Sequence, residues 1–399
     1  MGKQPLVKKP AARLVTSKKP AARKVTRIPQ RPEWAQKEEI SERQWKESTR
    51  QQKERWRYAH LYTTQHKDDS DAEPEDPCDL RVYQRSYTLP SLDLSLAREC
   101  RHLQKWPDQH CVDALMSALE SAGGALNFRT YFSNTRDRGR LLVEWPTPLH
   151  VNKEFRACIL FLQAACFTDL DMSNAHSFIC RYFSFLTQIP LMELQVYIRD
   201  RYILRGLLTA QGLEDDVAKR LWLSILNGGT LRGWLFKCKQ EFQGLEITIP
   251  VDLRNHCMKL EAEIKVLRDH VLGLGTWSEL VGDLERANAC KSKNRRKPEQ
   301  MKRSAWNCIL CTVETEVVQC LGQFIERLTP AQVVMPSYDG LLLHHASGLV
   351  CWSDSLQAQW TQLCINRWNF VFPVEPKDFL KHLPAYVREI LRLRKLLGE

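Results

Sequence analysis

Long apolar runs are missing from this sequence of 399 residues. No stretch approaches the roughly 18 consecutive apolar residues that a membrane-spanning helix needs, and the N-terminus lacks the apolar block of a secretory signal. A glycine-rich phosphate-binding loop is missing too. We therefore expect a non-secreted protein without a membrane partner, and we do not expect a P-loop nucleotide hydrolase. With 43% hydrophobic residues, the chain has enough apolar side chains for a substantial core.

A disulfide framework is not expected either, although the chain has 14 cysteines. The cysteines are scattered, and many lie in apolar runs, as do Cys158 and Cys180. Such positions are typical of reduced, buried thiols in a large cytosolic or nuclear protein. The pair Cys308 and Cys311 lies in an apolar segment without a second Cys or His pair at zinc-site spacing, so we interpret it as packing.

Acidic residues are absent from positions 1–32. Residues 1–60 hold 17 Lys and Arg against 6 Glu, which accounts for the whole net charge of +11, because the remaining residues carry 41 basic and 41 acidic side chains. The first 32 residues contain a near repeat, Lys8–Arg13 and Lys18–Arg23, with a proline in each copy. Since prolines block a continuous helix and large apolar groups are scarce, we expect a disordered basic tail.

Two functions fit this basic tail. Lys18 and Lys19 are candidates for contacts with nucleic-acid phosphates, because lysines displace counterions from a polyanion. The paired Lys-Lys clusters also resemble a nuclear import signal, which predicts an import receptor as a partner and the nucleus as the location. An organellar transit peptide is the alternative, and a cytoplasmic location also stays open.

Residues 33–66 are rich in helix-forming Glu, Lys, Arg and Gln and are expected to form a charged helix. Trp34, Trp45 and Trp56 recur every 11 residues, close to three helical turns, so the three indoles would share one stripe. Packing on the rest of the chain or stacking on a nucleic acid would explain the stripe. Residues 67–91 begin with an acidic, proline-containing stretch and are expected to be a linker.

From residue 92 onward, helical periodicity alternates with short apolar strands, which predicts an α+β fold. Asp339-Gly340 stands between two apolar runs and indicates a β-hairpin. The predicted strands are 164–171 and 331–338, with a partner run at 341–343, and the predicted helices are 92–123, 190–206, 214–226, 252–272 and 304–328.

The strand predicted at 164–171 ends in two carboxylates, Asp169 and Asp171. Residues two apart on a strand point to the same face. Carboxylates at the end of a buried strand are costly unless they are solvated, paired or bound to a cation. The pattern fits a metal site, although capping of the following helix by Asp171 or Ser173 explains it equally well.

Two further segments carry candidate residues. The helix predicted at 214–226 bears Lys219, which lies two turns before Asn227 and the glycine pair that begins at Gly228, so Lys219 and Asn227 would face a common groove. The hairpin places Asp339, after Tyr338, at the tip of an apolar β unit, where a plain turn is the alternative explanation.

The segment 291–303 is a basic loop. It holds seven Lys or Arg against one Glu. Arg295, Arg296 and Lys297 are its candidates for phosphate contacts, and a solvated surface loop is the alternative.

The order of these features matters more than any one of them. Two carboxylates from separate strands can hold two Mg²⁺ about 3.5–4 Å apart, and a helix-borne lysine can neutralise a leaving pyrophosphate. An acid at a strand end, then a lysine on a helix, then an acid at a hairpin is the arrangement that transfer of a nucleotide to a growing chain requires. The acids of the strand end, Lys219 and Asp339 are therefore candidates for this chemistry.

These blocks resemble the palm and fingers of family-A DNA polymerases and single-subunit phage-type RNA polymerases. They are more similar still to short polymerase-like proteins of large DNA viruses and mobile elements. The matching blocks are Asp169-Leu170-Asp171-Met172-Ser173-Asn174-Ala175-His176, Ala218-Lys219 with Gly228-Gly229, and Tyr338-Asp339-Gly340. The resemblance covers residues 125–345. The sequence lacks Tyr-x-Asp-Asp, so a reverse transcriptase of the usual type is disfavoured.

The resemblance implies a polymerase-like palm, a small antiparallel sheet, within 161–399, with helical fingers inserted at about 185–305 and a helical, thumb-like region at 92–160. It implies template-directed nucleotidyl transfer with Mg²⁺, and nucleic acid and nucleoside triphosphates as partners. The implied catalytic residues are Asp171, Lys219 and Asp339, with Asp171 and Asp339 as the metal ligands. The implied substrate contacts are Asp169, Ser173, His176, Arg140, Arg156, Asn227, Gly228 and Tyr338. The alternative is a domesticated, catalytically inactive palm that only binds nucleic acid.

Overall fold

The residues that the computed structural model describes all belong to one compact unit, residues 76–399. The tail 1–32, the helix 33–66, and Lys18, Lys19 and Arg295 lie outside the described residues. The described ranges are 86–103, 105–132, 140–143, 145–242, 247–290, 296–349 and 351–397.

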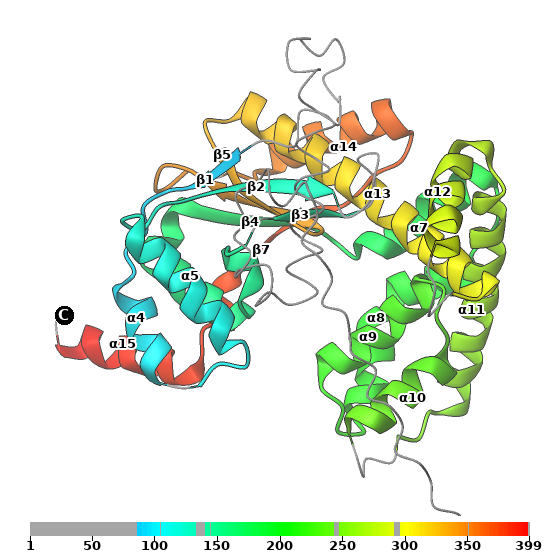
Figure 1. The fold of residues 1–399 in the computed structure, drawn as a ribbon, viewed down its shortest axis with the longest axis horizontal. Helices are drawn as coiled ribbons and strands as arrows, with labels where there is room; N and C mark the ends of the chain where they lie inside the picture. Colours follow the sequence, from blue (N-terminus) through cyan, green and yellow to red (C-terminus); the bar gives the residue numbers. More distant parts are fainter. Residues whose placement is uncertain are drawn as a thin grey trace, which may run out of the picture. The chain divides into compact units, whose positions relative to one another are not determined.

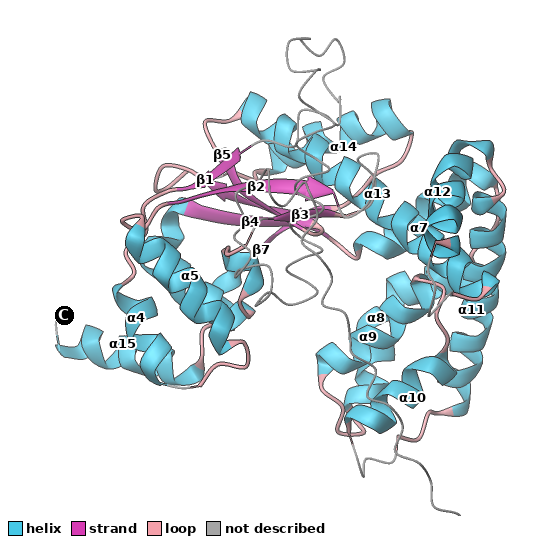
Figure 2. Ribbon diagram, in the orientation of Figure 1, coloured by secondary structure: helices cyan, strands magenta, loops and turns pink. Residues whose placement is uncertain are grey.

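The described residues form a mostly helical fold with two small antiparallel sheets, which confirms the α+β part of the predicted fold class (Figure 2). The first sheet has the order β1-β2-β3 and the second the order β5-β6-β4-β7. The strands are β1 Ser86–Leu89, β2 Leu126–Phe132, β3 Leu141–Val143, β4 Phe167–Met172, β5 Gln332–Ser337, β6 Gly340–His344 and β7 Val374–Lys377.

The predicted hairpin is present as β5 and β6, with Ser337 paired to Gly340 across a two-residue turn. Strand β4 lies between β6 and β7, and its Asp171 is opposite Gly340. A Cβ atom added to Gly340 would lie 2.2 Å from the carbonyl oxygen of Leu170 and 2.8 Å from a carboxylate oxygen of Asp171. Glycine is therefore required here by the close approach of β6 to β4.

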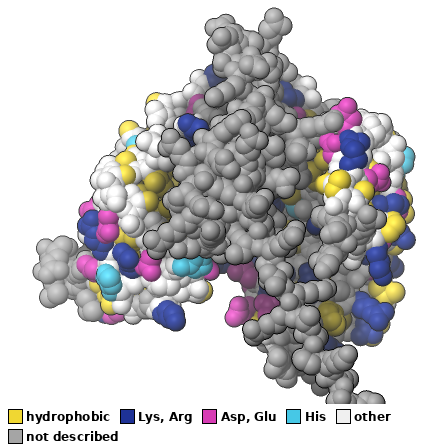
Figure 3. Space-filling model, in the orientation of Figure 1, with side chains coloured by type: hydrophobic (Ala, Val, Ile, Leu, Met, Phe, Trp, Pro, Cys, Tyr) yellow, Lys and Arg dark blue, Asp and Glu magenta, His cyan; other side chains and the backbone are white. Residues whose placement is uncertain are grey.

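The helices separate into groups around the second sheet (Figure 1). Helices α8 to α12 form a block on one side of the sheet, and α4, α5 and α15 lie on the other side. Helix α13 extends from this block to the sheet and contacts both. Lys and Arg side chains are exposed along the outer edge of the block (Figure 3). The helices are α4 Ser95–Leu103, α5 Gln109–Ser121, α6 Lys153–Leu160, α7 Ala175–Thr187, α8 Met192–Thr209, α9 Asp215–Leu226, α10 Leu231–Glu241, α11 Val251–Leu272, α12 Ser278–Ala289, α13 Pro298–Leu328, α14 Asp354–Trp368 and α15 Ala385–Leu397.

Helix α13 is the central helix of this unit. It contacts α7, α11 and α12 as well as β5 and β6. Among the described residues it alone is long and apolar enough to cross a membrane, but 83% of its most apolar 18-residue stretch is buried inside the protein. A core helix meets the same criteria of length and composition. Cys308, Cys311 and Cys320 lie buried on it, and no disulfide joins the described cysteines, in agreement with the sequence analysis.

The predicted helices 190–206, 214–226, 252–272 and 304–328 are confirmed as α8, α9, α11 and α13. The single helix predicted at 92–123 is wrong, because α4 and α5 are separate on either side of Trp106-Pro107. Proline lacks the N–H that would continue the helix. In the last turn of α4, the Cys100 carbonyl oxygen accepts a hydrogen bond from the Trp106 indole at 3.1 Å.

Three boundaries also differ from the sequence analysis. Strand β1 falls inside the segment predicted as a linker, and its alternating buried and exposed side chains show why it joins the sheet. Strands β2 and β3 lie inside the region predicted to be helical. Residues 164–166, predicted as strand, belong to the 3-10 helix Phe161–Cys166.

Candidate active site

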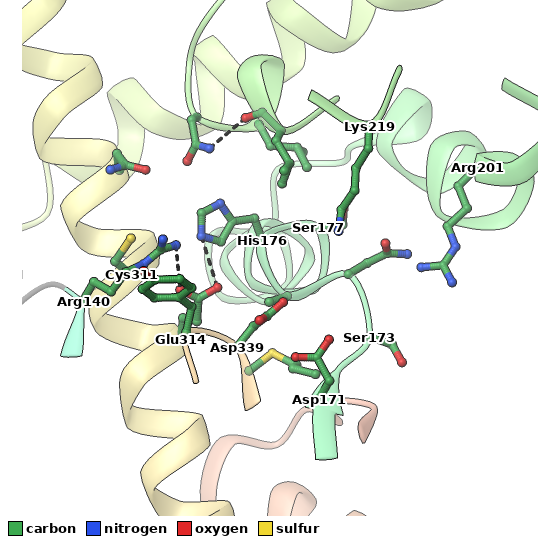
Figure 4. Close-up of a pocket in the computed structure, with 18 of the residues that line it drawn as sticks. Arg140, Asp171, Ser173, His176, Ser177, Arg201, Lys219, Cys311, Glu314 and Asp339 are labelled. Carbon is green, nitrogen blue, oxygen red and sulfur yellow. Dashed lines mark hydrogen bonds and ion pairs between the residues drawn. The ribbon is translucent and has the colours of Figure 1, made fainter. Parts of the chain in front are cut away.

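One cavity of about 980 Å³ collects most of the candidate residues (Figure 4). Its walls come from the end of β4, the β5–β6 turn, α7, α8, α9 and α13. These segments are far apart in the sequence, so only the fold brings them together. The predicted residues that line it are Arg140, Asp171, Ser173, His176, Lys219, Asn227, Arg296, Tyr338 and Asp339.

Asp171 and Asp339 lie together at one end of the cavity. Asp171 is the fifth residue of β4 and is 4% exposed, and Asp339 is in the turn that leads into β6. The backbone N–H of Met172 donates to the carbonyl oxygen of Asp339 at 2.7 Å, which fixes the turn against the end of β4. Figure 4 shows both carboxylates facing the same space.

Helix capping does not explain these acids. Helix α7 has Asn174 at its N-cap, with no side-chain cap hydrogen bond. Asn174 has a φ of 50°, so the chain turns sharply between β4 and α7 and leaves Asp171 and Ser173 at the cavity. The capping alternative for Asp171 and Ser173 is therefore not what the structure contains.

Lys377, on β7, forms an ion pair with Asp171. It is opposite Asp169 in the β4–β7 register. Burial lowers the pKa of Lys377, and the neighbouring Asp169 opposes that shift. No local sequence signal marked Lys377, because β7 is a short strand that reaches β4 only through the tertiary fold.

Arg156, Asp169 and Gly228 do not line the cavity, unlike the other predicted substrate contacts. Arg156 donates to the Pro148 carbonyl oxygen at 3.0 Å, and burial lowers its pKa. Burial raises the pKa of Asp169, because it disfavours the charged carboxylate, although Lys377 and Arg156 act in the opposite direction. Gly228 follows α9 with a φ of 79°.

Basic side chains face the two acids across the cavity. Lys219 on α9 and Arg201 on α8 project into it (Figure 4), and Arg205 and Lys381 also belong to its lining. Arg205 forms an ion pair with Asp215. Sequence reasoning found Lys219 but missed Arg201 and Arg205, since arginines on a helix carry no signal of their own.

A second charged group occupies the wall formed by α7 and α13. Arg140 lies 3.2 Å from Glu314 and stacks over the ring of Tyr338 at 4.5 Å from its centroid. His176 Nε2 lies 3.4 Å from the other carboxylate oxygen of Glu314. Burial by itself would lower the pKa of His176, but Cys311 and Glu314 raise it to about 10. Glu314 was not predicted from the sequence.

The remaining predicted residues have local roles. The Asn227 side chain donates to the Leu223 carbonyl oxygen at 2.8 Å at the end of α9. Arg296 lines the cavity and donates to the Ser304 hydroxyl. Lys297 is exposed outside the cavity, at the N-cap of α13.

No protein-family model matches the sequence, and no curated protein matches it. Among solved structures, the described fold is similar to the POL domain of Pol1 from M. smegmatis, which was solved in complex with a DNA primer-template and dNTP. The TM-score is 0.40 and the sequence identity is 13%. The match covers 67% of this chain and 50% of that one, so the chain spans about half of that protein. At this level of similarity, any functional inference depends on the cavity itself.

Proposed function

We propose that this chain is a template-directed nucleotidyltransferase of the DNA polymerase type, with Asp171 and Asp339 as ligands of two Mg²⁺ ions. One observation carries the proposal: two acids that are distant in the sequence lie together at one end of a cavity whose opposite wall is basic. An anionic substrate with a reacting phosphate fits such a polarity. The volume of about 980 Å³ is also large enough for a nucleotide.

The donor set at the two acids suits a hard divalent cation. Asp171 and Asp339 offer carboxylate oxygens, which Mg²⁺ prefers as ligands. Lys377 already balances the charge of Asp171, so a cation at this position would have to displace its ammonium group. When bound, Mg²⁺ supplies activation of a hydroxyl nucleophile and neutralisation of phosphate charge.

Other side chains of the cavity would bind and position the nucleotide. Lys219 and Arg201 would bind the triphosphate, because they project into the cavity from α9 and α8 (Figure 4). Ser173 and Tyr338 flank the two acids and would contact the nucleotide. Arg140 is held by Glu314 and by the ring of Tyr338, so we assign it to positioning Tyr338 rather than to phosphate binding.

Primer extension tests this proposal. The full chain is assayed with a primer-template, nucleoside triphosphates and Mg²⁺, beside Asp339→Asn and Asp171→Asn. Each substitution should lower extension by at least about 10³-fold, since it removes a charge that stabilises the transition state. Asp354→Asn on α14, outside the cavity lining, is the matched control. Extension that survives in both acid variants would rule the assignment out.

A nucleic-acid-binding protein without turnover is the second candidate, and the Asp171–Lys377 ion pair favours it. The ammonium group of Lys377 would then neutralise Asp171 in place of a metal ion, and the site would not catalyse a reaction. In that case the wild type binds DNA or RNA without Mg²⁺ and extends no primer. Affinity would fall steeply with salt, because phosphate contacts release counterions.

A further inference from the structure

Three metal-ligating side chains meet in the wall of the cavity between α7 and α13. They are His176, Cys311 and Glu314, and their ligand atoms all lie within 4.8 Å of one another. Cys311 and Glu314 are three residues apart and so share one face of α13. His176 is the second residue of α7 and points toward that face (Figure 4).

The chemistry of this group differs from that of the two aspartates. An imidazole, a thiol and a carboxylate together are ligands for zinc-class ions, whereas Mg²⁺ takes oxygen ligands. Zinc–ligand distances of about 2.0–2.3 Å place the ligand atoms of a tetrahedral site roughly 3.3–3.8 Å apart. The observed limit of 4.8 Å is within about 1.5 Å of that spacing, a difference that side-chain rotation can close.

The contacts of His176 suit a metal ligand. Its side chain is 6% exposed, and within the described part of the chain neither ring nitrogen makes a hydrogen bond. Its closest charged contact is the ion pair at 3.4 Å to Glu314. A metal ion bound between the imidazole, Glu314 and Cys311 would give a ring nitrogen of His176 a shorter and stronger contact than this ion pair.

The surroundings leave room for an ion to enter and for a fourth ligand. All three side chains line the cavity, although each is at most 6% exposed. Glu314 has two oxygens, one facing His176 and one at 3.2 Å from Arg140. One oxygen can therefore bind an ion while the other keeps its ion pair with Arg140. Such outer contacts orient metal ligands in known sites.

We infer that His176, Cys311 and Glu314 form a binding site for a zinc-class divalent ion, with its fourth position open to the cavity. This site is separate from the one proposed at Asp171 and Asp339. The interpretation of Cys311 as mere packing, made from the sequence, is revised by its position beside His176. Through Arg140 the ion would also stabilise Tyr338, the residue next to Asp339.

Cobalt spectroscopy tests the site on the full chain after chelation. Co²⁺ alone should bind at one equivalent and give a thiolate-to-cobalt charge-transfer band together with the strong visible bands of four-coordinate cobalt, and Zn²⁺ should displace it. Cys311→Ser should abolish the charge-transfer band. His176→Gln and Glu314→Gln should each weaken binding at least about tenfold.

Cys308→Ser is the matched control, because Cys308 is also buried on α13 and lines the cavity but is not part of the cluster. It should leave the spectrum unchanged. No charge-transfer band at saturating Co²⁺, a band that survives Cys311→Ser, or a band that disappears equally in Cys308→Ser would overturn the inference. None of these results involves a nucleotide, so the outcome is independent of primer extension.

Alkylation of the wild type provides a measurement that needs no variant to fold. Zn²⁺ should slow the modification of Cys311 by a thiol reagent at least about tenfold, as read by mass spectrometry, because a coordinated thiolate reacts slowly. The exposed Cys290 should react at the same rate with and without Zn²⁺. Equal rates at Cys311 under both conditions would contradict the site.

Discussion

At the scale of single residues, the ion pair between Lys377 and Asp171 decides how the acidic end of the cavity behaves. The ammonium group lies where a cation bound to Asp171 would lie. A cation must displace it, so the ion pair lowers the apparent affinity for Mg²⁺ without removing a ligand. The same ion pair stabilises the buried carboxylate of Asp171, because an unpaired buried charge is costly.

Lys377→Met should therefore strengthen binding of Mg²⁺. Methionine keeps much of the aliphatic length while removing the competing charge, and we expect the half-saturating Mg²⁺ concentration to fall by about tenfold, equivalent to about 1.4 kcal/mol. Isothermal titration of the full chain with Mg²⁺ measures it. Lys259→Met, which removes an exposed lysine paired with Glu193, is the control and should change nothing. An unchanged or weaker affinity in Lys377→Met would show that Asp171 does not take part in cation binding.

Single residues also show the limit of sequence reasoning. Asp171, Lys219 and Asp339 could be found because each carries a local signal: a strand end, an amphipathic helix or a hairpin turn. Glu314, Cys311 and Lys377 could not, since their partners come from segments that approach them only after folding. Arg156 and Asp169 were expected at the substrate, and neither belongs to the lining of this cavity.

At the scale of elements, the close approach of β4 and β6 positions the site. The turn residues indicated a hairpin, but the sequence could not show that Gly340 would be the point at which β6 touches β4. A side chain at Gly340 has no room, since its Cβ would lie 2.2 Å from the Leu170 carbonyl oxygen. The two strands would have to separate, and Asp339 would then move away from Asp171.

Gly340→Ala should lower the free energy of unfolding by about 2–3 kcal/mol or more, as expected for overpacking against backbone. Chemical denaturation measures the change. Gly206→Ala on α8 is a control with the opposite sign, because its added Cβ meets nothing within 4 Å and alanine favours a helix by about 0.5–1 kcal/mol. A neutral Gly340→Ala would mean that β6 does not pack against β4 this closely.

A buried arginine joins two of the long helices. Arg268 on α11 is 1% exposed and forms ion pairs with Asp269 at 2.9 Å and with Glu299 on α13 at 2.7 Å. Burial by itself would raise the pKa of both carboxyls, but Arg268 lowers them below their usual values. A carboxyl whose pKa is lowered by folding stabilises the folded state above its unfolded pKa, and this stabilisation disappears as the pH falls through the folded pKa.

Acid should therefore destabilise the wild type more than Arg268→Met. As the pH falls through the lowered folded pKa values of the two carboxyls, they become protonated and leave a buried guanidinium without its ion-pair partners, a situation that costs up to about 3–5 kcal/mol. The Met variant has no such charge, so the difference in unfolding free energy between the two proteins should shrink from pH 7 to pH 3. Urea denaturation at both pH values measures it. A difference that stays constant with pH would show that these pairs contribute nothing through charge.

At the scale of the whole molecule, the charge is divided along the chain. Residues 1–60 carry the entire net charge of +11, while the rest of the chain is balanced. The basic wall of the cavity is a local concentration of positive charge in a part of the chain whose net charge is zero. The net positive charge of the whole chain comes from residues 1–60. Binding of a polyanion should therefore have two parts: salt-dependent attraction through the tail and positioning through the cavity.

Deletion of residues 1–32 separates these two parts, because it removes ten Lys and Arg and no acid. For each phosphate that the tail no longer neutralises, the slope of log affinity against log salt should become shallower by about 0.7–0.9. We expect affinity for single-stranded or duplex DNA to fall by at least about tenfold at low salt, as measured by fluorescence anisotropy. Lys18→Gln with Lys19→Gln should give a smaller change of the same sign. Identical slopes for the full and the shortened chain would mean that the tail does not touch phosphates, and transport through an import receptor would then be the better proposal for its lysine clusters.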